Sequence, residues 1–126
     1  MIGRPERALM ALGGLAGCLG IALSAASSHG TGGGTLDISA RFLLAHAPAL
    51  IGVALAAGSG LAHRRTALAA GALLVSGIAL FSGDLAVRAF RGAALFAMAA
   101  PAGGILLMAG WALLVVAAVT GGRTQE

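Results

Sequence analysis

Four long apolar runs, separated by short polar segments, dominate the pattern of hydrophobic and polar positions along the chain. The apolar runs cover residues 8–28, 42–61, 67–87 and 94–119. The polar separators are residues 29–41, 62–66 and 88–93. A membrane-spanning helix needs about 20 apolar residues to cross roughly 30 Å of hydrocarbon, so each run predicts one transmembrane helix.

Because the separators are short, consecutive helices are expected to run antiparallel as neighbours. The prediction is an all-α protein with one integral membrane domain over residues 1–126, folded as an up-down four-helix bundle. The composition agrees, because 59% of the 126 residues are hydrophobic and 10% are charged, against about 25% charged in soluble domains. The net charge of +4 comes from eight arginines without a basic stripe, so nucleic acid is not an expected partner.

The first apolar run allows two interpretations. Residues 15–18, Leu-Ala-Gly-Cys, match the processing box of a lipoprotein, and Arg4 and Arg7 precede the run as in a signal peptide. However, the run continues past Cys18 and is long enough to span a bilayer, unlike a short signal segment. We therefore expect a retained first helix, with cleavage before Cys18 as the alternative. The single cysteine also excludes an intrachain disulfide.

The distribution of arginines predicts the orientation in the membrane. One set of helix ends carries Arg4, Arg7, Arg64, Arg65 and Arg123. The opposite set carries Arg41, Arg88 and Arg91. The excess on the first set predicts that both termini lie in the cytoplasm.

Small residues at helical spacing indicate how the helices meet. In lipid the hydrophobic effect does not drive helices together, so small side chains that let two backbones approach become important. The candidates for helix packing are Gly13, Gly17, Gly20, Gly52, Ala56, Gly60 and Gly110.

The polar residues of the apolar runs are predicted to gather in the outer leaflet. The candidates for this polar or functional layer are His29, His46, Ser82, Gly83, Asp84, Arg88, Pro101, Gly103 and Gly104. Ionisable residues inside a membrane are functional candidates by default. Each also has a structural alternative: Asp84 and Arg88 have the spacing of an ion pair on one helix. Pro101 would interrupt the fourth helix and free the carbonyl of Ala97, to which His46 could donate. Asp84 would lie within reach of His46 or Arg41 across the bundle.

Sequence motifs for catalysis are weak. Residues 29–34, HGTGGG, resemble a hydrolase oxyanion loop, but the chain has no G-x-S-x-G nucleophile elbow. The segment is therefore expected to be a flexible outer loop. The histidines and aspartates lack the spacing that builds a metal site on one helix. We expect no catalytic, cofactor or metal site, with an enzyme acting on a lipid or quinone as the alternative.

Several short motifs, in their order and separations, resemble one known family. They are Ser28-His29-Gly30, His46-Ala47, Arg64-Arg65, Leu80-Phe81-Ser82-Gly83, Pro101-Ala102-Gly103-Gly104 and Ala109-Gly110-Trp111. Over residues 8–119 the chain resembles the small four-helix membrane proteins called domain of unknown function 423. These proteins are widespread in bacteria and are similar to the eukaryotic transmembrane protein 256. The resemblance implies the four-helix architecture and an address in the bacterial inner membrane, but no established activity.

The chain departs from the usual pattern of this family at Asp84, where relatives commonly carry serine. The resemblance implies that a shared functional group lies among the other candidates, including Ser82 and Gly83. We therefore expect Asp84→Ser to fold normally and Gly83→Leu to fail to fold.

These observations predict a small polytopic membrane protein without enzymatic activity. Its expected role is that of a helical subunit or accessory protein, and its expected partners are the lipid bilayer and other membrane subunits or further copies of the chain. The alternative is a carrier or pore for a small solute or a proton, which would use the polar layer and an interrupted fourth helix. The scarcity of polar residues through the inner half of the bundle is the main difficulty for that alternative.

Overall fold

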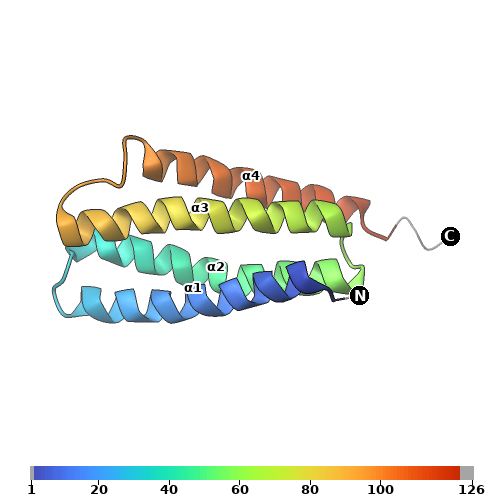
Figure 1. Ribbon diagram of the computed structural model, residues 1–126, viewed down its shortest axis with the longest axis horizontal. Helices are drawn as coiled ribbons and strands as arrows, with labels where there is room; N and C mark the ends of the chain where they lie inside the picture. The colour runs from blue at the N-terminus through green and yellow to red at the C-terminus, as the bar shows by residue number, and fades with distance from the viewer. Residues whose placement is uncertain (1, 123–126) are drawn as a thin grey trace.

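Four long α-helices joined by short connections make up the protein (Figure 1). The computed structural model describes residues 2–122. The helices are α1 (Arg4–Ser28), α2 (Gly33–Ser59), α3 (Arg64–Arg91) and α4 (Ala99–Thr120). Each helix is long and apolar enough to cross a membrane, and successive helices run in opposite directions. The chain is therefore an all-α, multi-pass membrane protein with an up-down course.

The helices extend past the apolar runs at their polar ends. α2 begins at Gly33 rather than at residue 42, so residues 33–41 of the polar separator are helical, whereas residues 29–32 of the predicted flexible loop are not. α3 continues to Arg91 rather than ending at residue 87. Hydropathy marks only the part of a helix that is apolar, whereas backbone hydrogen bonds continue through charged turns at the membrane surface.

The fourth helix begins later than the hydropathy pattern predicts, at Ala99 rather than at residue 94. Pro101 consequently lies in the first turn, where a backbone N–H has no acceptor within the helix and its absence costs little. Pro101 therefore lies at the start of α4 and does not interrupt it. The predicted break, with a freed carbonyl at Ala97, is wrong.

The four helices pack in chain order rather than in a closed square. α2 packs against α1 and α3, and α3 packs against α4, whereas α1 contacts α3 only lightly. Figure 1 shows α1 and α4 at opposite edges of the molecule. Helices α2 and α3 are therefore central, and α2 contributes the most buried residues. We call the end with the two termini and the α2–α3 turn the terminal end, and the other the loop end.

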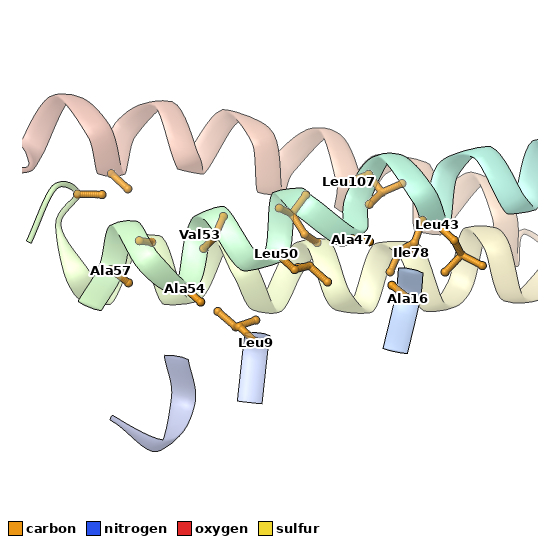
Figure 2. Packing of buried hydrophobic residues seen from close by; sticks show 14 residues of the cluster. Leu9, Ala16, Leu43, Ala47, Leu50, Val53, Ala54, Ala57, Ile78 and Leu107 are labelled. Carbon is orange, nitrogen blue, oxygen red and sulfur yellow. The ribbon is translucent and has the colours of Figure 1, made fainter. Parts of the chain in front are cut away.

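Leucines and alanines fill the space between the helices (Figure 2). Leu50 and Val53 of α2 are almost fully buried and lie beside Leu9 of α1. Small buried residues such as Ala54 and Ala57 keep the distance between the helices short. The core is therefore formed by close backbone approach as well as by large side chains.

The contact between α3 and α4 shows this approach directly. A Cβ atom placed on Gly103 would lie 2.5 Å from the backbone nitrogen of Phe81 and 2.8 Å from the carbonyl oxygen of Gly77. A Cβ on Gly77 would in turn lie 2.8 Å from the backbone nitrogen of Leu107. Because these neighbours are backbone atoms, no change of side-chain rotamer can make room for a larger residue.

Other predicted packing glycines lie at helix contacts of the same kind. A Cβ on Gly13 would lie 2.8 Å from the carbonyl oxygen of Ala47, and one on Gly20 would lie 2.8 Å from Cγ of Leu44. Gly17 has more room, since its Cβ would lie 3.5 Å from Cβ of Ala47. The first helix therefore meets α2 along a face of glycines.

Gly110 of α4 faces the third helix. A Cβ there would lie 2.8 Å from Cδ2 of Leu74. Ala56 of α2 is half-buried and packs against the core. Both positions therefore lie where helices of this chain meet.

Gly52 and Gly60 correct the sequence prediction. A Cβ on Gly52 would meet nothing within 4 Å, and the residue is exposed. Gly60 lies after the last residue of α2 with φ of 81°, a left-handed conformation that ends a helix. Neither residue lies at a contact between helices of this chain. In a chain with 21 glycines, helical spacing alone does not distinguish a packing glycine from an exposed one.

Candidate functional site

Five polar or charged side chains are buried within the bundle. They are Glu6, Ser39, His46, Ser82 and Asp84. Within residues 2–122, no buried side-chain nitrogen or oxygen lacks a hydrogen-bond partner. Leaving such a group unpaired away from water is costly, so each of the five residues identifies a specific contact.

Asp84 connects the third helix to the loop that follows it. One carboxylate oxygen accepts a hydrogen bond from Nε of Arg88 at 2.7 Å, and the other accepts from the backbone N–H of Leu95 at 2.7 Å. The carboxylate is fully buried, while the Arg88 side chain is 44% exposed. The predicted ion pair is therefore present, but Asp84 does not bind His46, and its second partner is the loop backbone.

Gly83, next to Asp84, has more space than the sequence suggests. A Cβ on Gly83 would meet only Cδ1 of Leu95, at 3.9 Å, which is an ordinary van der Waals distance. The geometry therefore favours the opposite expectation, since a side chain has room to begin at position 83 and Asp84→Ser removes a carboxylate with two partners. The sequence does not show this, because the second partner of Asp84 is Leu95, in the loop that follows α3.

Two serines form a reciprocal pair between α2 and α3. The hydroxyl of Ser39 donates to the carbonyl oxygen of Ser82 at 2.7 Å, and the hydroxyl of Ser82 donates to the carbonyl oxygen of Ser39 at 3.1 Å. The sequence pattern identifies Ser82 but misses Ser39, because hydropathy places residues 29–41 in a loop. The pair fixes the register of the two central helices.

His46 and Trp111 join α2 to α4. Nδ1 of His46 donates to the carbonyl oxygen of Phe42 at 2.7 Å, and Nε2 accepts a hydrogen bond from Nε1 of Trp111 at 3.1 Å. A carbonyl can only accept and an indole N–H can only donate, so the ring is neutral and carries its proton on Nδ1. The carbonyl acceptor predicted near Pro101 is thus replaced by that of Phe42, and Trp111 is a further partner, as a donor.

The position of His46 along α2 follows from where the helix begins. His46 lies about 20 Å from Gly33, near the middle of α2, and four residues inside the apolar run that begins at residue 42. The candidate polar residues make separate contacts, between different helices or with a loop, and do not form one connected layer.

The terminal end contains a buried ion pair that the sequence pattern does not reveal. Glu6 is fully buried, and its two oxygens accept hydrogen bonds from Nε and Nη2 of Arg64 at 2.6 Å and 3.1 Å. One of these oxygens also accepts from the backbone N–H of Gly3 at 2.8 Å. A glutamate three residues after a helix cap is a recognisable signal, but its arginine lies on a distant helix. The pair joins the beginnings of α1 and α3.

The remaining predicted residues do not complete a common site. His29 is exposed after the end of α1, and its Nδ1 contacts the carbonyl oxygen of Ala25 at 2.7 Å. A Cβ on Gly104 would lie 4.0 Å from Phe81, so this position has room. No three His, Cys, Asp or Glu side chains gather as a metal site in the described part of the chain. The predicted layer is therefore a set of separate structural contacts.

A comparison with protein families identifies the chain. The family described as Protein of unknown function (DUF423) matches residues 20–104. The chain belongs to this family. The DUF423 region contains His46, Ser82 and Gly103, whereas Glu6 and Trp111 lie outside it. Two of the internal contacts, the Arg64 ion pair and the His46 hydrogen bond, thus reach beyond the DUF423 region. No solved structure matches the chain.

Proposed function

We propose that this DUF423 protein is a non-enzymatic membrane subunit that associates with other membrane helices, either of a larger complex or of further copies of itself. The observation that supports this proposal is the internal use of its buried polar groups. Both oxygens of Glu6 and of Asp84 accept hydrogen bonds, and both ring nitrogens of His46 are engaged.

Catalysis and transport both require polar groups that are free to bind a substrate or to exchange protons. In this bundle the groups placed to do so instead hold one helix to another or, for Asp84, a helix to the following loop. The surface that remains for a partner is apolar: on α4, Ile105, Met108 and Val119 are each more than 60% exposed. In a membrane such a surface contacts lipid or other helices, and small-residue and dispersion contacts stabilise the latter.

The proposal includes a cellular setting. We place the protein in a bacterial inner membrane with both termini in the cytoplasm and with the bilayer and other membrane subunits as partners. Arg4, Arg7, Arg64 and Arg65 at the terminal end support this orientation; Arg123 lies outside the described residues. A reporter fused to the C-terminus is expected to be active only when it is of a kind that functions in the cytoplasm.

Purification from native membranes tests the association. A tagged chain is extracted in a mild detergent, and the proteins that accompany it are identified by mass spectrometry. We expect the chain to migrate as part of a larger particle of reproducible composition. A monodisperse monomer of 12.2 kDa without partners would contradict the proposal. Gly103→Ala should lose the partners, because it disturbs the contact between α3 and α4, and Gly104→Ala should keep them. Proteins that adhere non-specifically would accompany both variants equally.

The alternative, a carrier or pore, depends on an outer polar layer and an interrupted α4. The helix is not interrupted at Pro101, and the buried polar groups of residues 2–122 are already hydrogen-bonded within the chain, so the geometry supports this alternative less. Proton or solute flux into vesicles containing the purified protein tests it. Flux above that of protein-free vesicles, lost in His46→Ala, would replace our proposal with the alternative.

A further inference from the structure

An apolar groove runs between α1 and α3, and α2 forms its floor. It arises because α1 and α3 each pack on α2 but contact one another only lightly. One section, of about 480 Å³, is lined by residues such as Leu15 and Leu19 of α1, Leu43 of α2, and Ala79 of α3. The groove opens on the outer surface of the bundle. In a membrane its default contents are hydrocarbon chains.

A second section extends the groove to the terminal end. It has a volume of about 320 Å³ and is lined by Ala8 of α1 and by Leu68 and Ala72 of α3. The two sections share Leu12 and Val75 as lining residues, so they adjoin along the space between α1 and α3. At the terminal end, Arg64 and Glu6 bridge α3 and α1 and hold the sides of the groove at a fixed separation.

Two arginines without ion-pair partners lie at this end of the groove. Arg65 precedes Leu68 and Ala72 by three and seven residues, which places it on the same face of α3. Arg4 precedes Ala8 by four residues and lies at the edge of the corresponding face of α1. Both arginines are exposed, and within residues 2–122 the ion pairs involve other arginines.

The other end of the groove has a different character. Along the same face of α3, the residues that follow Gly83 and Ala86 at helical spacing lead to Phe90, which is 57% exposed. The groove is therefore basic at one end and apolar at the other. This polarity matches a phospholipid, whose phosphate lies at the membrane surface while its acyl chain extends into the hydrocarbon.

We propose that this groove binds an anionic phospholipid, with one acyl chain between α1 and α3 and the phosphate held by Arg65 and Arg4. Guanidinium groups bind phosphate oxygens through charge-assisted hydrogen bonds, and basic pockets between transmembrane helices bind anionic headgroups. A zwitterionic headgroup would bring its own cation to the two arginines. A second copy of the chain in the same orientation would bring further arginines to the same level, so charge also disfavours that occupant.

Native mass spectrometry of the purified protein tests this site. The protein is titrated with phosphatidylglycerol or with phosphatidylcholine, and the bound lipid is counted for each variant. We expect phosphatidylglycerol to bind preferentially, and Arg65→Gln to weaken it by about fivefold, the effect expected for one arginine near a membrane surface. Arg7→Gln is the matched control, because Arg7 is exposed at the same end but faces away from the groove.

Filling the groove provides a second, independent variant. Ala79 lines the groove and is exposed, so Ala79→Phe should fold and should displace the acyl chain. Ala112→Phe on the exposed surface of α4 is its control. Equal binding of the two lipids, equal losses for Arg65→Gln and Arg7→Gln, or unchanged binding in Ala79→Phe would each overturn the proposal. A lipid-free dimer would assign the groove to a second copy instead.

Discussion

The most direct test of helix packing compares two single variants, in which one or the other of two adjacent glycines of α4 is replaced by alanine. A Cβ on Gly103 would lie 2.5 Å from the backbone nitrogen of Phe81, whereas one on Gly104 would lie 4.0 Å from Cδ2 of the same residue. Ordinary contacts begin near 3.4 Å, so in Gly103→Ala the two helices must separate by about 0.9 Å. Gly104→Ala requires no movement of the two helices.

The expected magnitude follows from this geometry. Forcing a methyl group into a packed contact costs about 1–3 kcal/mol. Replacing glycine by alanine within a helix gains roughly 0.5–1 kcal/mol in both variants, so this gain cancels in the comparison. We therefore expect Gly103→Ala to be less stable than Gly104→Ala by about 1–3 kcal/mol, with Gly104→Ala at least as stable as the unmodified protein.

Unfolding in mixed micelles measures this difference. The fraction of denaturing detergent is raised while the fluorescence of Trp111, the only tryptophan, reports the contact between α2 and α4. Equal stability of the two variants would refute the reasoning, because it would mean that α3 and α4 do not approach at Gly103. A larger loss of stability in Gly104→Ala would mean that Gly104, rather than Gly103, faces α3.

Three further predictions follow from the buried polar contacts. Gly83→Leu should retain its unfolding midpoint, because the position opens into the groove, whereas Asp84→Ser should lower it, because serine is too short to reach both partners of the carboxylate. A double-mutant cycle of His46→Phe and Trp111→Phe, followed by circular dichroism, should give a coupling of about 0.6–1.7 kcal/mol, the range of hydrogen bonds between membrane helices. Glu6→Gln should speed hydrogen exchange in the first turn of α1, because it removes the charge that binds α3.

Each of these predictions has a clear opposite outcome. A lower midpoint in the Gly83 variant alone would favour the sequence-based expectation for that pair of residues over the geometry. A coupling near zero would show that α2 and α4 are not hydrogen-bonded. Unchanged exchange in the Glu6 variant, with Arg7→Gln as a control at a nearby exposed arginine, would mean that the ion pair does not hold the first turn.

The four spans were predictable because a run of about 20 consecutive apolar residues is typical of membrane helices and rare elsewhere. Within a predicted helix, the partner of each polar residue was not predictable. The pairing of Asp84 with Arg88 was the exception, since they are four residues apart on one helix. The contact between Asp84 and Leu95 depends on the path of a loop, which hydropathy does not describe.

Contacts between distant helices account for the remaining differences. Glu6 and Arg64 belong to different helices, and nothing in the spacing of either residue identifies the other. Ser39 escapes prediction because its glycine-rich neighbourhood resembles a loop, although that segment forms the first turns of α2. Pro101 indicates a break only if α4 starts at residue 94, five residues before its actual start at Ala99. In each case the role of a local pattern depends on tertiary packing.

The central claim is that the buried polar side chains are hydrogen-bonded to groups of the same chain and are not available for chemistry or transport. The proton position on the His46 ring tests it most directly, because this residue is buried and both of its ring nitrogens are hydrogen-bonded. Nitrogen-15 solid-state NMR of the protein in bilayers, with labelled histidine, distinguishes the tautomers. We predict a neutral ring protonated at Nδ1, with Nε2 bound to the indole N–H of Trp111. A ring protonated at Nε2, or one insensitive to Trp111→Phe, would contradict the account.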